Sequence, residues 1–196
     1  MAVTHANSPG HSAIVRYTHW INALSFFALL ISGIAVLLAH PRLYWGETGA
    51  VGMSSLLDLP LPFLLTGQSG WGRSLHFLSA WICVLNGLAY VGRVRAGALA
   101  GYAFVQRLSY AVVVFLLLPL MIWTGFAMSP AITSVCPVIV TSLGGQQSAR
   151  TIHFFVAAAL VVFLFGHVVM VWITGFRVNM RGMITGAGGD LRSIAE

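Results

Sequence analysis

The sequence predicts an all-α integral membrane protein built as a bundle of four transmembrane helices. Hydrophobic residues make up 58% of the 196 residues and charged residues only 7%, whereas a soluble domain carries roughly a quarter charged residues. Four separate segments are also apolar enough to cross a bilayer, whose hydrocarbon core of about 30 Å needs about 20 residues in a helix. Lipid must therefore surround much of the chain.

The four predicted spans cover about residues 16–39, 73–92, 106–129 and 150–176 of a membrane domain at 16–177, between tails at 1–15 and 178–196. The first is long enough to stay as an anchor, and no small-residue cleavage site of a signal peptide follows it. The third contains Pro119, which should kink the helix without ending it. The segment 56–66 is apolar but short and holds two prolines, so we expect an interfacial loop element there.

The arginines set the expected orientation, because cytoplasmic loops carry the excess of positive charge. One side holds seven of the ten: Arg16, Arg93, Arg95, Arg107, Arg177, Arg181 and Arg192. The other side holds Arg42, Arg73 and Arg150. This distribution predicts both termini in the cytoplasm, with the loops at 40–72 and 130–149 on the opposite, periplasmic side of the membrane.

The composition also excludes several classes of function. The net charge is +6, but the arginines form no basic cluster or stripe of the kind that binds nucleic acid. The two cysteines, Cys83 and Cys136, are far apart and lack a C-x-x-C or C-x-x-C-H pattern. This argues against a disulfide framework, a zinc site or covalently attached haem, and favours an apolar filler at Cys83 and a loop residue at Cys136.

Four of the seven histidines lie at or within the predicted spans, where ionisable groups are costly and usually functional. These are His19, His76, His153 and His167, whereas His5, His11 and His40 lie outside. His153 and His167 are 14 residues apart on one helix, which is close to four turns, so they share a face about 21 Å apart. They cannot bind the same metal ion.

Each histidine of the fourth span therefore needs a partner at its own depth. His76 opens the second span on the same side as His153, and His19 opens the first span on the side of His167. Two imidazoles from facing helices suit a non-covalent b-type haem, whose iron takes axial ligands on both sides of the ring. The sequence thus predicts two haems b, on His76 with His153 and on His19 with His167.

Two other interpretations of the histidines remain open. One is a non-haem metal site, which normally gathers three or four ligands. These histidines instead lie in two pairs at different depths in the membrane, and no acidic residue lies within a span. The histidines could also be core residues whose hydrogen bonds are satisfied within the protein and that bind no metal.

Arg16, Arg73 and Arg150 each precede a histidine by three residues, about one helical turn nearer the water. They can pair there with haem propionates, or they can be ordinary snorkelling arginines. Gly33 and Gly125 lie within spans, where a small residue lets a haem or a neighbouring helix approach closely.

Over residues 12–186 this pattern of histidines resembles the di-haem cytochrome b subunits of bacterial membrane formate dehydrogenases, nickel-iron hydrogenases and thiosulfate reductases. The stretches "LYWGETG" (43–49), "GWGRSLHFLSAW" (70–81) and "GGQQSARTIHFF" (144–155) are similar to a subgroup that accompanies periplasmic molybdopterin (molybdenum-cofactor) oxidoreductases.

The resemblance implies a quinone pocket near the cytoplasmic haem, for ubiquinone or menaquinone. The family builds it from the start of the first span, where this chain has Tyr17, and from the loop before the third span. There relatives show Tyr-Asn-x-x-Gln-Lys, and this chain reads "YAFVQR". Tyr102 and Gln106 match, Ala103 replaces the asparagine and Arg107 replaces the lysine.

The expected function is electron transfer between the quinone pool and a periplasmic partner, either a molybdopterin oxidoreductase or a c-type cytochrome, by a subunit that could also form a homo-oligomer. The alternative is a stand-alone superoxide:quinone oxidoreductase of the same four-helix plan, with Arg42, Arg73 and Arg150 as a cationic patch. A non-redox transporter is disfavoured, because the spans hold no acidic relay and no pair of broken helices.

Overall fold

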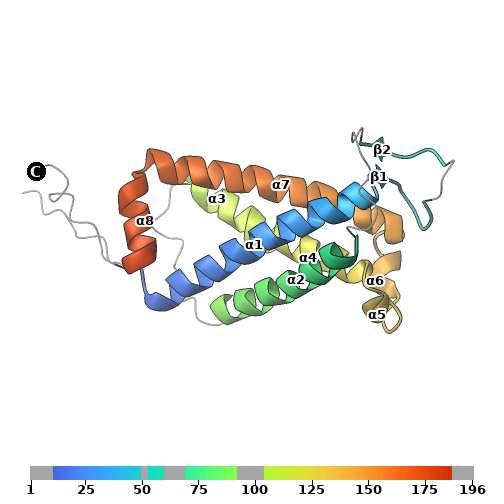
Figure 1. The fold of residues 1–196 in the computed structure, drawn as a ribbon, viewed down its shortest axis with the longest axis horizontal. Helices are drawn as coiled ribbons and strands as arrows, with labels where there is room; N and C mark the ends of the chain where they lie inside the picture. The colour runs from blue at the N-terminus through green and yellow to red at the C-terminus, as the bar shows by residue number, and fades with distance from the viewer. Residues whose placement is uncertain (1–10, 50–52, 60–68, 92–103, 187–196) are drawn as a thin grey trace, which may run out of the picture. The chain divides into compact units, whose positions relative to one another are not determined.

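The computed structural model describes residues 11–49, 53–59, 69–91 and 104–186 (Figure 1). The chain divides into two compact units. The first unit contains Met1–Val36, Gly67–Ala96 and His167–Glu196, and the second contains Leu37–Thr66 and Gly97–Gly166. The predictions made for Arg93, Arg95, Tyr102 and Arg192 fall outside the described residues.

The described chain is mostly helical. Its helices are α1 (Ala13–Ala39), α2 (Ser69–Val91), α3 (Phe104–Val112), the π-helical turn η1 (Val113–Leu117), α4 (Leu118–Ala127), α5 (Pro130–Thr133), α6 (Val138–Thr141), α7 (Gln146–Ile173) and α8 (Phe176–Thr185). Two short strands, β1 (Arg42–Leu43) and β2 (Leu57–Asp58), pair antiparallel, with Arg42 opposite Asp58. The fold is therefore not purely α-helical, since a small hairpin lies in the loop after α1.

The long helices begin before the apolar stretches that predict them. Three of them start at Ala13, Ser69 and Gln146, whereas the predicted spans start at 16, 73 and 150. Hydropathy marks only the part of a helix that lies in lipid, but backbone hydrogen bonding continues into the polar turn outside it. The expected fourth span also ends early, at Ile173, and a separate helix, α8, follows within the region expected to be a tail.

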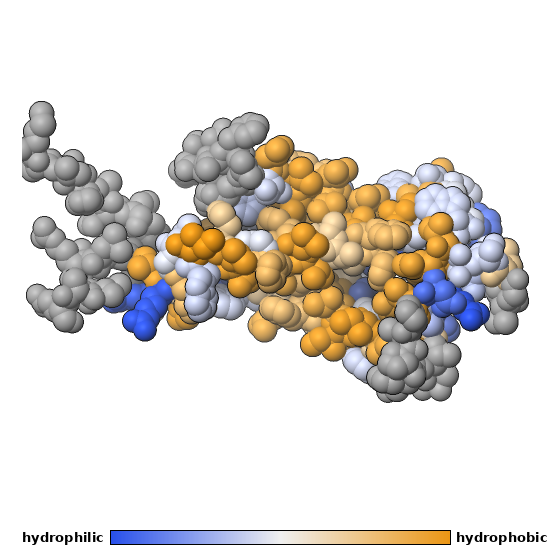
Figure 2. Space-filling view, turned by 90° about the horizontal axis from the view of Figure 1, so that it is seen from above, coloured by the Kyte–Doolittle hydropathy of each residue, from blue (hydrophilic) through white to orange (hydrophobic). Residues whose placement is uncertain are grey.

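Three of the described helices are long and apolar enough to cross a membrane: Ala13–Ala39, Leu108–Ala127 and Gln146–Ile173. Helix α2, expected as the second span, has 23 residues but is less apolar than these three, since it carries Arg73, His76 and Asn86. Large apolar side chains are exposed along the helices (Figure 2), as they are when lipid is the solvent.

In the first unit, helix α1 buries small and hydroxylated side chains and exposes large apolar ones, the reverse of a helix in a soluble protein. Its buried residues are small or hydroxylated, namely Thr18, Ser25, Ser32 and Ala35. Large apolar residues such as Leu24, Phe27 and Ile31 are exposed. Small residues allow close helix packing in membranes, where burying apolar side chains against protein brings little gain over lipid.

Helix α2 packs on this face of α1 through a small residue and an amide pair. Gly72 lies against Ala35 and the Ser32 carbonyl, where a side chain would be crowded. About four turns further along α2, Asn86 Nδ2 donates to the Thr18 carbonyl at 2.8 Å and to Asn22 Oδ1 at 2.7 Å. The amide pair fixes the register of α2 on α1 next to His19.

Replacing Asn86 with alanine should lower the unfolding midpoint of the detergent-solubilised protein, because two interhelical hydrogen bonds are lost. Such bonds in membranes are worth about 0.6–2 kcal/mol each, so the loss of two costs about 1–4 kcal/mol, which corresponds to roughly 2–16 °C for a chain of this size. Circular dichroism on heating measures the shift. Leu85→Ala is the matched control, since Leu85 is 60% exposed on the same helix; an equal shift in both variants would exclude a specific role for the amide.

Helix α8 also belongs to the first unit and folds back on the start of α1. It begins after Gly175 and ends at Gly186, both with positive φ, a conformation that suits glycine. Trp20 Nε1 donates to the Met183 carbonyl at 3.1 Å. The guanidinium of Arg16 occupies the space that a side chain at Gly186 would need. The predicted cytoplasmic end of α1 is thus covered by α8.

In the second unit, the hairpin loop is fastened to the N-terminus of α7. The Gly46 N–H donates to Ser148 Oγ at 2.7 Å, and Thr151 Oγ1 donates to the Tyr44 carbonyl at 2.6 Å. In return, the Gly46 carbonyl accepts from the backbone N–H of Gln147 at 2.9 Å. The loop therefore satisfies N–H groups that the first turn of a helix leaves unpaired.

The third predicted span is built from α3, η1 and α4 and runs through Pro119 without ending. Proline cannot donate a backbone hydrogen bond, and its ring crowds the carbonyl four residues earlier. Here the helix widens to a π turn at Val113–Leu117 just before it, with the Leu118 N–H bonded to the Val113 carbonyl. A π turn thus accommodates the proline that was expected to kink the helix.

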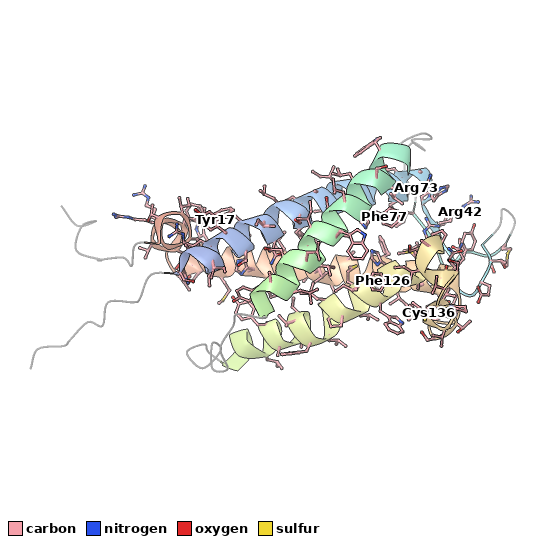
Figure 3. The ribbon with its side chains drawn as sticks, turned by 90° about the horizontal axis from the view of Figure 1, so that it is seen from below. Tyr17, Arg42, Arg73, Phe77, Phe126 and Cys136 are labelled. Carbon is pink, nitrogen blue, oxygen red and sulfur yellow. The ribbon has the colours of Figure 1, made fainter. Side chains whose placement is uncertain are left out.

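The short helices α5 and α6 close the end of this span in the second unit. Ala127, Ile139 and Ala149 form a buried core there, with Phe126 and Cys136 packed against it (Figure 3). Cys136 therefore fills apolar space beside the core. The expected periplasmic loop at 130–149 is thus a folded cap and holds two helices.

Candidate functional site

In the first unit, the structure brings together two of the four predicted ligands. His19 lies on α1 and His167 on α7, and their ring centroids are 6.3 Å apart with the planes tilted by 48°. The spacing fits two imidazoles on opposite sides of one iron. With a metal–nitrogen bond of about 2 Å and each ring centre roughly 1 Å behind its nitrogen, the two centroids would lie about 6 Å apart.

The surroundings of this pair also suit a bound anion. Arg16 lies one turn before His19, and its Nε is buried and has no hydrogen-bond partner among the described residues. An unpaired buried donor is costly unless a partner outside the chain satisfies it. The carboxylate of a haem propionate would do so, which fits the role predicted for Arg16. Trp20 lies edge-on to the His19 ring, with centroids 5.6 Å apart.

His76 is held by α1 within the first unit. Its Nδ1 lies 3.0 Å from Ser32 Oγ. Gly33 follows Ser32, and the ideal Cβ position of this glycine would lie 3.5 Å from His76 Cε1. The ring therefore rests against a Ser-Gly pair, with the hydroxyl on its Nδ1 and the glycine beside its Cε1.

His153 has the same kind of support in the second unit. Its Nδ1 lies 2.8 Å from Thr124 Oγ1 of α4. The next residue is Gly125, and the ideal Cβ position of this glycine would lie 3.8 Å from His153 Cε1. Gly33 and Gly125, predicted to line haem pockets, are thus both placed against a predicted ligand.

The arginines near these two histidines differ from each other. Arg73 is exposed on α2, one turn before His76 and beside Phe77 (Figure 3). Arg150 is half-buried, and its guanidinium donates to the His40 carbonyl. Arg150 therefore connects the end of α1 to α7 within the second unit. This structural role was not predicted from the sequence, which indicated only a contact with a propionate.

The predicted quinone residues are only partly described. Tyr17 is 67% exposed on α1 (Figure 3). Gln106 and Arg107 lie in the first turn of α3, but only their backbone is described, and Tyr102 falls outside the described residues.

Sequence reasoning missed three groups that contact or flank the ligands: Ser32, Thr124 and the Asn22–Asn86 pair. A signal for the first two was present, since a hydroxyl residue directly precedes each glycine that was chosen, in "SG" (32–33) and "TG" (124–125). The rival non-haem metal site would need a third ligand. Within the described ranges, no group of three or more His, Cys, Asp or Glu side chains gathers as such a site requires.

Comparisons with known proteins agree with this chemistry. A model of the family described as prokaryotic cytochrome b561 matches residues 10–186. YedZ1 of Azospira oryzae, whose name describes it as a candidate protein-methionine-sulfoxide reductase subunit, is 24% identical over 196 residues, covering 82% of this chain and 89% of the relative. No solved structure matches the chain. Together with the three apolar helices, the family match identifies a membrane protein that binds haem b.

Proposed function

Because the chain belongs to the prokaryotic cytochrome b561 family, we propose that it is a di-haem electron-transfer subunit. It passes electrons between the quinone pool and a periplasmic molybdopterin oxidoreductase. The observation that supports this proposal best is the pair of imidazoles of His19 and His167, 6.3 Å apart. This spacing suits two imidazoles that would hold one haem iron.

Four histidines would hold the two haems. His19 and His167 ligate the haem on the cytoplasmic side, and His76 and His153 ligate the haem on the periplasmic side. When bound, haem b would supply one-electron exchange, and histidines held on each iron would favour electron transfer over oxygen binding. Arg16 would carry a propionate of the first haem, since its buried Nε lacks a partner among the described residues.

The proposal includes the topology that the arginine distribution predicts. Helix α2 would cross the membrane as the second of four spans, in spite of its polar residues, because Ser32 accommodates His76 and the Thr18 carbonyl and Asn22 accommodate Asn86. Both termini would then lie on the cytoplasmic side of a bacterial inner membrane. Quinone would bind on the cytoplasmic side, near Tyr17 and the start of α3.

The partner would dock on the folded cap of the second unit. Val135 after α5 is 85% exposed and Trp45 in the hairpin loop is 60% exposed, and exposed apolar and aromatic side chains of this kind are typical of protein contacts. A relative whose name denotes a subunit of a protein-methionine-sulfoxide reductase supports a reductase as the partner.

The superoxide:quinone alternative is weakened by the state of its arginines. Arg42 Nε lies 3.1 Å from Asp58 Oδ2, and the negative charge of Asp58 raises the pKa of Arg42. Arg150 is bonded to the His40 carbonyl. Two of the three cations expected to attract superoxide are therefore engaged within the protein.

The proposed function is tested with the purified protein in mild detergent. A pyridine haemochrome assay should give about two b haems per chain, and a reduced short-chain quinol should reduce both anaerobically. Mild purification should also recover a molybdenum-containing protein with the chain. A haem content well below two per chain, or no reduction by quinol, would contradict the proposal. Rapid superoxide consumption by the isolated chain would favour the alternative.

A further inference from the structure

We propose that Ser32 and Thr124 are positioning residues that hold His76 and His153 as Nδ1-protonated imidazoles, which makes Nε2 the nitrogen that would bind iron. The inference rests on the proposed function, because it assumes that both histidines are haem ligands. It names the two protein groups that orient those ligands and set their donor strength.

The protons of the two hydroxyl groups are already committed to the backbone. Ser32 Oγ lies 2.6 Å from the Ala28 carbonyl oxygen and 3.1 Å from that of Leu29. Thr124 Oγ1 lies 2.8 Å from the Leu120 carbonyl oxygen and 3.0 Å from that of Met121. Two oxygen atoms at these distances need a proton between them, and a carbonyl has none to give. Each hydroxyl therefore donates within its own helix, as serine and threonine commonly do in membrane helices.

An occupied hydroxyl can only accept at its remaining lone pair. The contacts of 3.0 Å from His76 Nδ1 to Ser32 and 2.8 Å from His153 Nδ1 to Thr124 must then be N–H···O bonds that the rings donate. A neutral imidazole carries one N–H, so Nε2 is the ring nitrogen that keeps a lone pair. The second ring nitrogen of a ligand decides the tautomer in this way throughout metal-binding proteins.

The residue after each hydroxyl completes the support. Gly33 and Gly125 lie against the Cε1 atoms of His76 and His153, with 3.5 Å and 3.8 Å from the ideal Cβ position of each glycine to the ring. Larger side chains than alanine would push the ring away from the hydroxyl. The same Ser/Thr-Gly arrangement occurs on α1 in the first unit and on α4 in the second. Its recurrence on two helices favours a common role in holding the ligand over incidental packing.

The hydrogen bond should also make each ligand a better electron donor. An N–H that is bonded to an oxygen shares its proton, which raises the basicity of the opposite nitrogen. A more basic ligand stabilises ferric over ferrous haem. Removing the hydroxyl should therefore raise the midpoint potential of the haem that the histidine ligates, and loosen that haem.

Four variants and one control test the inference. Ser32→Ala and Thr124→Val remove the hydroxyls, Ser32→Thr and Thr124→Ser keep them, and Ser25→Ala removes another buried serine of the same face of α1. In Ser32→Ala and Thr124→Val we expect haem affinity to fall about 10–100-fold at one site. The fraction of haem still bound at that site should show a higher midpoint potential in a redox titration. The rise should be up to about 59 mV for a tenfold change in the site's affinity for ferric relative to ferrous haem. Its low-spin EPR signal should change as well.

The outcomes separate the two proposals. If the unmodified protein binds no haem, the proposed function fails and the inference fails with it. If the unmodified protein binds two haems and all variants keep their EPR signals, potentials and haem content, only the inference is wrong. It would also be wrong if the hydroxyl-retaining variants or Ser25→Ala showed the same changes as Ser32→Ala, because a purely structural disturbance would then explain them.

Discussion

Replacing His167 with alanine should reduce the haem content of the purified protein from about two per chain to about one, because one iron loses an axial ligand. His19→Ala should remove the same haem, since the rings of these two residues face each other at 6.3 Å. His76→Ala and His153→Ala should each remove the other haem. The pyridine haemochrome assay gives the number, and low-temperature spectra of the reduced protein identify which haem is lost.

His40→Ala is the matched control. His40 is exposed at the end of α1, and its contact with Arg150 is made by the backbone carbonyl, which the substitution keeps. This variant should therefore retain both haems. If all four ligand variants also retained their full pigment, the assignment of the ligands would be wrong. If His76→Ala and His167→Ala removed the same spectral component, the pairing by depth would be wrong.

Gly145→Ala should have the largest effect on folding. Gly145 has a φ of +116°, which alanine adopts only with strain, and an added Cβ would lie 2.5 Å from the carbonyl carbon of Gly46. Backbone strain of this kind costs about 1–3 kcal/mol, and overpacking a tight contact costs about 1–3 kcal/mol more. We expect the unfolding midpoint to fall by roughly 5–20 °C.

The control for this variant is Gly70→Ala. Gly70 lies in the first turn of α2, and nothing lies within 4 Å of the Cβ position, so the midpoint should change little. Heating curves followed by circular dichroism compare the two variants. A midpoint for Gly145→Ala equal to that of the unmodified protein would show that the loop at Gly46 can move away from α7 at little cost.

Much of the fold follows from the sequence because lipid imposes a simple rule on length and polarity. Helices α1 and α7 were predicted within a few residues for this reason, and the polar exceptions within the apolar segments indicated His19 and His167. The rule is weaker for α2, since a span that carries Arg73, His76 and Asn86 depends on its neighbours to accommodate them. His76 and Asn86 find their partners only in the folded chain, at Ser32 for the histidine and at Thr18 and Asn22 for the asparagine.

Other features could not be predicted from local pattern. A hairpin of two-residue strands has no periodicity to detect, and α8 follows α7 after only two residues, Thr174 and Gly175. The roles of Ser32 and Thr124 depend on a ring that arrives from another helix. Each hydroxyl is also consistent with an ordinary bond to its own backbone, so the sequence alone does not distinguish a supporting residue from a neutral one.

The fastening of the hairpin loop to α7 has a consequence for biogenesis. Gly46 and Tyr44 bond to residues that follow them by 102 and 107 positions. When the ribosome has inserted only the first two helices, those partners have not yet been synthesised. The loop can form these hydrogen bonds only after α7 has been synthesised. Until then, we expect the loop of the nascent chain to be accessible to proteases.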